Sequence, residues 1–100
     1  MLVVAGSIEI DPANRDAAVA AALRMMEETQ REPGCLSYTF SADLAEPGRF
    51  RIFEEWQDEA ALHAHFKAPH MAAFQKAVAG LGVRRMAIQR YDVSAVGPVR

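Results

Sequence analysis

The order in which the hydrophobic period changes along the chain constrains its fold more than any other feature. Apolar residues recur at about every second position over residues 35–43 and 49–56, which is the period of half-buried strands. A Glu-Pro-Gly turn at residues 46–48 separates them, so we expect an antiparallel hairpin. Residues 2–10, rich in Val and Ile, and residues 83–94 are predicted as two further strands.

A helical period occupies the stretch between the first strand and the hairpin. Asp11 is suited to cap a helix over residues 12–31, Pro12 fits its first turn, and the Pro-Gly pair at residues 33–34 ends it. Apolar side chains at i, i+3, i+4 and i+7 predict one buried stripe. Its members are Val19, Ala22, Leu23 and Met26.

The second helical stretch is expected to be broken. Asp58 is placed to cap a helix over residues 59–67, Pro69 interrupts it, and a second piece runs over residues 70–79. The order is therefore β-α-β-β-α-β. This order predicts a single α+β domain over residues 1–100 of the ferredoxin-like kind, with an antiparallel sheet and both helical stretches on one face.

The second face of the predicted sheet needs cover of its own. The side chains of Thr39, Phe53 and Glu55 alternate onto this face. Their mixture is too apolar for an ordinary solvent-exposed surface and too polar for a hydrophobic core. Because 51% of the residues are hydrophobic and a chain this size buries only about two thirds of its unfolded surface, we expect a homodimer with the sheets face to face. The charges expected at its edge are Arg84, Arg85 and Arg90, with Glu54 or Glu55 as partners.

Composition excludes several classes of protein. The net charge is −2 and no basic run occurs, so the electrostatic footprint of a nucleic-acid-binding protein is missing. No apolar run approaches the roughly 20 residues that a membrane span needs, and the N-terminus resembles a strand more than a signal peptide. The one cysteine, Cys35, forbids an internal disulfide and favours a cytoplasmic location.

Five short motifs follow one another along the second and third quarters of the chain. They are Glu32-Pro33-Gly34-Cys35-Leu36-Ser37-Tyr38, Phe53-Glu54-Glu55-Trp56, Ala61-Leu62-His63-Ala64-His65-Phe66, Pro69-His70 and Phe74.

In this order and spacing, and with the elements around them over residues 2–94, these motifs resemble the antibiotic-biosynthesis-monooxygenase family. The resemblance implies a dimeric α+β barrel. It also implies one of several activities, which include cofactor-independent oxygenation of phenols, oxidation of quinols and degradation of haem. The haem-degrading branch uses an asparagine on the first strand and a later tryptophan–histidine pair. This chain has Gly6 and Ser7 there and no tryptophan after Trp56, so the haem reaction is disfavoured.

His65 is the candidate catalytic residue. A cofactorless oxygenase needs a dry pocket in which an acidic aromatic substrate becomes an electron-rich anion, and an imidazole titrates near neutral pH. The structural alternative is a histidine at a helix end, bonded to a backbone carbonyl or across the dimer. The candidate substrate-binding residues are Tyr38, Trp56, Phe66, His70 and Phe74.

Several of these residues also have a structural interpretation. Trp56 and Tyr38 could pack in the hydrophobic core, and His70 could be a solvated surface histidine. Cys35, which is not a site candidate, is expected to be a small buried residue. No metal site is expected, because His63 and His65 diverge by about 200° on a helix and cannot share an ion.

We therefore expect a cofactor-independent monooxygenase that oxidises a small phenolic or quinol-type aromatic. The competing hypothesis is a non-catalytic dimeric module on the same fold, which binds a small molecule or acts in a stress response.

Overall fold

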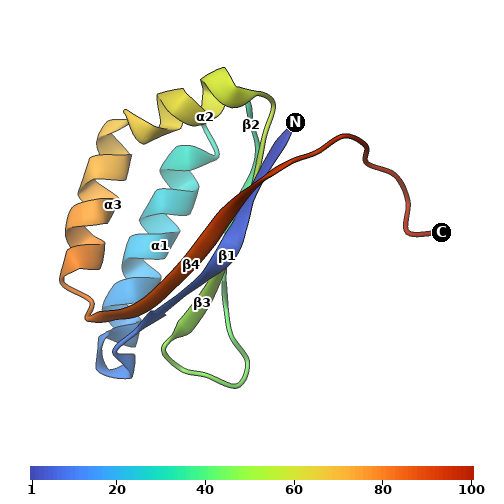
Figure 1. The fold of residues 1–100 in the computed structure, drawn as a ribbon. Coiled ribbons are helices and arrows are strands. Elements are labelled where there is room, and N and C mark those ends of the chain that lie inside the picture. The colour runs from blue at the N-terminus through green and yellow to red at the C-terminus, as the bar shows by residue number, and fades with distance from the viewer.

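The computed structural model describes residues 1–100 as one α+β layer pair. A four-stranded antiparallel sheet in the order β2-β3-β1-β4 carries the helices on one face (Figure 1). This is the predicted ferredoxin-like arrangement. The elements are β1 (Leu2–Ile10), a 3₁₀ turn η1 (Pro12–Asn14), α1 (Arg15–Thr29), β2 (Cys35–Ala42), β3 (Arg49–Trp56), α2 (Glu59–Phe66), α3 (Pro69–Ala79) and β4 (Val83–Asp92).

The register of the hairpin places alternate β3 side chains on the helix-covered face. Ile52 lies opposite Phe40, and Glu54 lies opposite Tyr38. Phe50, Ile52, Glu54 and Trp56 are all buried, whereas Arg51 and Phe53 on the other face are exposed. The strand period therefore determines which β3 residues reach the protein interior.

The buried stripe of α1 differs from the predicted one by a shift around the helix. Leu23, expected in the core, is 59% exposed, because the helix turns its small side chains toward the sheet. Alanines at the contact let the backbone of α1 approach closely, and Met25 then fills the deeper space. The buried residues of α1 are Ala18, Ala21, Ala22, Met25 and Thr29.

Both helical stretches begin at the expected residues but with local differences. Asp11 accepts a hydrogen bond from the Ala13 amide, so it caps the short 3₁₀ turn η1, and α1 begins three residues later than predicted. Asp58 accepts from the Ala61 amide at 2.9 Å and caps α2. Pro69 occupies the first turn of α3 after an extended Ala68, which confirms the predicted break.

The core lies between the sheet and the helices in two clusters. The first surrounds Trp56 and the second lies at the opposite end of the sheet, near Phe50. The members of the first cluster are Leu2, Met25, Tyr38, Ile52, Trp56 and Leu62, and those of the second are Ile8, Ile10, Ala18, Phe50 and Leu81.

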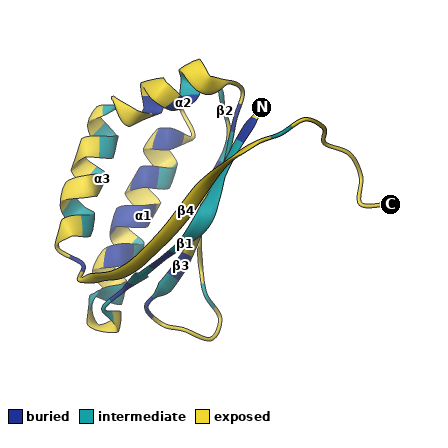
Figure 2. Cartoon of the chain, viewed as in Figure 1, coloured by how far each residue is buried: buried dark blue, intermediate teal, exposed yellow.

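The two edge strands of the sheet, β2 and β4, have many exposed side chains. Leu36, which the strand period places on the same face as Tyr38 and Phe40, is 56% exposed, because the β2–β3 register shifts between Cys35 and Ser37 and a bulge turns a side chain away from its expected face. All ten residues of β4 are exposed (Figure 2).

None of the helices has the combination of length and hydrophobicity that a membrane-spanning helix requires.

Gly6 generates a test of the β1–β4 pairing. It lies between Ile52 of β3 and Ile88 of β4, and a Cβ added there would collide with the carbonyl oxygen of Ala87. Gly6→Ala should therefore lower the free energy of unfolding by about 1–3 kcal/mol, the usual cost of overpacking, in urea denaturation. Gly97→Ala is the control, since a Cβ at Gly97 meets nothing within 4 Å; equal stability of the two variants would contradict the described register.

Candidate functional site

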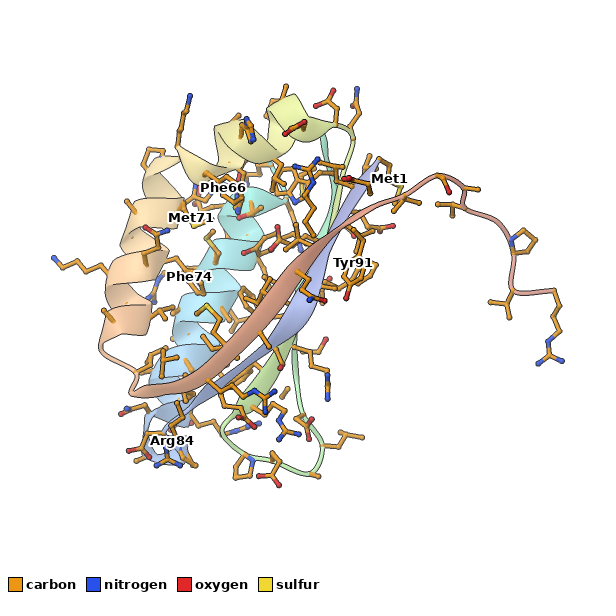
Figure 3. The ribbon with its side chains drawn as sticks, viewed as in Figure 1. Met1, Phe66, Met71, Phe74, Arg84 and Tyr91 are labelled. Atoms are coloured by element: carbon orange, nitrogen blue, oxygen red, sulfur yellow. The ribbon has the colours of Figure 1, made fainter.

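A cavity of about 430 Å³ lies between the helix-covered face of the sheet and the α2–α3 pair. Phe66, Met71 and Phe74 point into it from the two helices (Figure 3). Such a volume, with mostly apolar walls and a few polar groups, is typical of a small-molecule site. The lining residues are Val4, Ile8, Tyr38, Phe40, Ile52, Glu54, Leu62, Phe66, Met71, Phe74, Gln75, Val78, Met86, Ile88, Gln89 and Arg90.

Glu54 is the one acidic residue in the cavity wall. Only 5% of its surface is exposed, and one carboxylate oxygen, Oε1, accepts a hydrogen bond from the Trp56 indole N–H at 2.9 Å. Burial raises the pKa of Glu54 from 4.5 to about 7, with a smaller upward contribution from Glu32, while the Trp56 hydrogen bond opposes the shift. A carboxyl group with this pKa exchanges its proton near neutral pH, which is the property required of an acid–base catalyst.

A second polar group, the Glu32–His65–His70 cluster, lies next to the cavity. Glu32 Oε2 contacts His65 Nδ1 at 2.7 Å and His70 Nε2 at 2.8 Å. His65 is 1% exposed, and burial lowers its pKa although Glu32 pulls it upward. The neutral ring that results donates from Nδ1 to the carboxylate, and its buried Nε2 has no hydrogen-bond partner in the protein.

Stacked rings join the cluster to the cavity wall. The His65 ring lies 4.7 Å from the Trp56 ring and 5.5 Å from the Tyr38 ring, centroid to centroid. Trp56 is fully buried and in turn holds Glu54. Burial, together with Glu54 and Glu32, raises the pKa of Tyr38, so this phenol remains a neutral hydrogen-bonding group at any working pH.

The structure divides the residues expected at the site into two groups. Tyr38, Phe66 and Phe74 line the cavity. Trp56 and the expected catalytic His65 lie behind the wall, in the core, where His65 bonds to the Glu32 side chain rather than to a backbone carbonyl as its structural alternative supposed.

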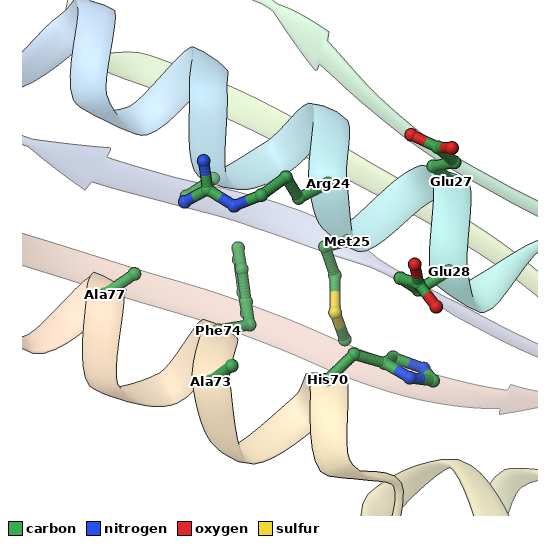
Figure 4. Close-up of a pocket in the computed structure, with 9 residues that line it drawn as sticks. Arg24, Met25, Glu27, Glu28, His70, Ala73, Phe74 and Ala77 are labelled. Carbon is green, nitrogen blue, oxygen red and sulfur yellow. The ribbon is translucent and has the colours of Figure 1, made fainter.

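His70 faces a different depression. A groove of about 260 Å³ runs between α1 and α3, and His70, Ala73, Phe74 and Ala77 of α3 form one of its walls (Figure 4). Arg24, Met25 and two glutamates of α1 form the other. His70 therefore closes the outer side of the Glu32 cluster and does not line the cavity.

The arginines of β4 have other partners than the expected Glu54 and Glu55. Arg90 bonds to Glu59 at 3.3 Å and to Asp92 at 3.0 Å, and Arg84 lies 3.6 Å from Asp11. Glu54 does not pair with these arginines within the chain, because the strand period places that carboxyl under the helices rather than at an edge.

Glu32, His65 and His70 are also the residues that could hold a metal ion. Their ligand atoms lie within 4.8 Å of one another, and two imidazoles with one carboxylate suit Zn²⁺ or Fe²⁺. No metal site was predicted, because His63 and His65 are the only pair of histidines on one predicted helix. Glu32 and His70 reach His65 from other elements, so the spacing of the sequence does not reveal this grouping.

Two functional candidates, Glu54 and Glu32, were missed as site residues although the sequence carried a signal for each. Glu54 shares the period of Phe50, Ile52 and Trp56, which places a carboxyl among buried positions. Glu32 opens the Glu-Pro-Gly-Cys motif that carried the family resemblance. For Glu54, a charged residue within a buried pattern indicated a site, and for Glu32 the indication was its place in the motif.

The fold and the cavity together define a ferredoxin-like domain with a partly open, largely apolar pocket between the sheet and the helices. The family model described as antibiotic biosynthesis monooxygenase matches residues 1–77. The chain belongs to this family.

Known relatives support this assignment. The chain is 30% identical to the probable quinol monooxygenase YgiN of Escherichia coli over an alignment of 90 residues. The match covers 80% of this chain and 86% of YgiN. It is 33% identical to the uncharacterized protein sll1783 of Synechocystis over 93% of its own length, but it spans only 63% of that relative. A Deinococcus radiodurans crystal structure with the same family assignment superposes with a TM-score of 0.92 at 26% identity and covers 100% of this chain and 99% of that one.

The buried carboxyl group predicts an unusual pH dependence of stability. Between pH 4.5 and about 7 the unfolded chain ionises Glu54 while the folded chain keeps it protonated. The contribution of this group to the free energy of unfolding is therefore lost as pH rises through that window. The shift corresponds to about 3 kcal/mol. Glu54→Gln should remove this loss and unfold at a higher temperature than the wild type above pH 7.

Thermal unfolding followed by circular dichroism at pH 5 and pH 8 measures the effect. Glu27→Gln is the matched control, because the Glu27 side chain is 66% exposed and its replacement should change both midpoints little. A Glu54→Gln variant less stable than the wild type at pH 8 would show that the ionised carboxylate stabilises the fold.

Proposed function

We propose that this protein is a cofactor-independent monooxygenase that oxidises a small phenolic or quinol-type aromatic in the cavity beneath α2 and α3. The single observation that carries the proposal is the combination of an apolar, aromatic-walled cavity with one buried ionisable group, Glu54. The name of the relative YgiN points the same way. The cytoplasm is the location we propose for this reaction.

The chemistry requires an anion and a dry environment. A hydroquinone that loses a proton becomes electron-rich enough to pass electrons to dioxygen. One oxygen atom then enters the ring, and the other leaves as water with two hydrogens of the substrate, so the quinol becomes a hydroxyquinone. Phe66, Met71 and Phe74 give the cavity apolar walls, and a substrate packed against them would displace water from this step and strengthen the few polar interactions around it.

The residues predicted from the sequence have distinct proposed roles. Tyr38, Phe66 and Phe74 would contact the substrate ring, and the Tyr38 hydroxyl would donate to an oxygen of the substrate or product. His65 would act indirectly as a positioning residue, since its ring stacks on Trp56 and its Nδ1 is fixed by Glu32. His70 would hold Glu32 from the outer side.

Non-catalytic binding of a small aromatic remains the alternative function, and the same cavity would serve it. Oxygen consumption separates the two hypotheses. Purified protein treated with EDTA should consume oxygen with at least one member of a panel of hydroquinones and anthrones, and the oxidised product should appear in equal amount. Saturable binding of a panel member without oxygen uptake would instead support a binding module.

A homodimer is part of this proposal. The open face of the sheet presents Phe53 and Tyr91, which are 47% and 48% exposed, among Thr39, Ser41 and Arg51. The exposed strand β4 leaves a sheet edge unpaired (Figure 2), and such edges are normally covered. A second copy would cover both the face and the edge, and would complete the barrel that the family resemblance implies.

Light scattering at micromolar concentration should therefore give twice the 11.0 kDa mass of one chain. Phe53→Glu should weaken this dimer, because it would bury an unpaired charge in the interface. Leu44→Glu is the control, since Leu44 is fully exposed in the turn between β2 and β3. A wild-type monomer at this concentration would contradict the proposed dimer.

A further inference from the structure

The geometry points to Glu54, rather than the histidine next to it, as the catalytic residue that takes the proton of the substrate hydroxyl. This inference deepens the proposed function and rests on it. Glu54 is the one residue in the cavity wall that carries a carboxylate, and no histidine lines the same space.

The two oxygens of the Glu54 carboxylate have different surroundings. Oε1 accepts the hydrogen bond of the Trp56 indole, which holds this oxygen in place. Oε2 receives no hydrogen bond from the protein, and the side chain faces the cavity with Tyr38 opposite it on β2. A ligand hydroxyl is therefore the natural donor to Oε2.

The titratable and charged groups near Glu54 come from several elements. Glu32 approaches from the connection between α1 and β2, Cys35 from the start of β2, and Arg90 lines the cavity from β4, while His65 of α2 stacks on Trp56. The β1 residue paired with Glu54 is the uncharged Val4. Burial and Glu32 both disfavour the ionised carboxyl, so its pKa rises to about 7. A base with this pKa is half ionised at neutral pH and holds a proton well once it has taken one.

The proton transfer itself is simple. The O–H bond of the bound phenol breaks, its proton forms a bond with Glu54 Oε2, and the electron pair stays on the phenolate oxygen. The total charge of the cavity does not change, because the negative charge moves from the carboxylate to the ligand. Arg90, whose guanidinium is held by Glu59 and Asp92, supplies a cation at the same cavity for the new anion.

His65 is less suited to this role. Its Nδ1 already bonds to Glu32, and burial lowers its pKa. Its ring also belongs to the core behind Trp56 rather than to the cavity wall. We assign it to the support of Trp56, so its replacement should reduce stability more than it changes the pH profile.

Kinetics provide the first test. Glu54→Gln keeps the size of the side chain and an oxygen for the Trp56 hydrogen bond. This variant should lower kcat for hydroquinone by about 10²-fold, the usual scale of general-base catalysis, with KM changed much less. The wild-type rate should rise with pH around pH 7, and the variant should lose that rise. His63→Gln is the control, because His63 is an exposed histidine on α2, the helix that carries His65.

Trp56 supplies a second readout that needs no turnover. It is the only tryptophan in the chain, and its indole touches the group in question. Its fluorescence should titrate with a midpoint near pH 7 in the wild type and in His63→Gln, and this step should vanish in Glu54→Gln. His65→Gln should keep the step, which separates the carboxyl group from the stacked imidazole.

The outcomes distinguish the inference from the function on which it rests. Turnover by Glu54→Gln at the wild-type rate, or a fluorescence step that disappears with His65 instead, would overturn the inference and leave the oxygenase intact. If the wild-type protein consumes no oxygen with any member of the panel, this result contradicts both the proposed oxygenase activity and the catalytic role of Glu54. If Glu54→Gln does not fold, the wild-type pH profiles of rate and of Trp56 fluorescence must share one midpoint; two different midpoints would overturn the inference.

Discussion

The hydrogen bond between the Trp56 indole and the Glu54 carboxylate is the interaction on which the site depends. It exists because the strand period places residues 54 and 56 on the same face of β3, under the helices. An isolated carboxyl in that position would face a large desolvation cost. One fixed donor reduces this cost without removing it, and the carboxyl remains easy to protonate.

The rest of the polar interior extends from this pair. His65 stacks on Trp56, Glu32 fixes His65, and His70 holds Glu32 from the surface. The break at Pro69 matters because it turns the chain between α2 and α3, so that His65 and His70 approach one carboxylate from two helices. Buried polar groups of this kind specify one arrangement of the core when their hydrogen bonds are made.

Much of the fold follows from the sequence, because period and turn residues act locally. Residues 2–10 and 49–56 form strands with the predicted bounds, and Asp58 and Pro69 mark helix starts as expected. The buried residues of α1 were predicted incorrectly, because alanines pack as well as larger residues where a helix lies close to its neighbours. Which residues form the cavity was harder to predict, since that depends on how far α2 and α3 stand from the sheet.

The same distinction applies to the site residues. Aromatic candidates such as Phe66 and Phe74 could be found because helical spacing places them on an inner face. Glu32 could not be joined to His65 from spacing alone, because they lie 33 positions apart and meet only in the folded chain. The strand period alone could have placed Glu54 on the buried face of β3, but Glu54 was interpreted as a charge at the edge of the sheet.

The central claim is that a small aromatic binds in the cavity with its hydroxyl on Glu54. An anaerobic crystal structure with bound hydroquinone tests this most directly. We expect the ring to lie between Phe66 and Phe74 on one side and the sheet on the other, with one hydroxyl oxygen within hydrogen-bond distance of Glu54 Oε2. Hydroquinone bound in the groove between α1 and α3, or on the open face of the sheet, with this cavity unchanged would contradict it.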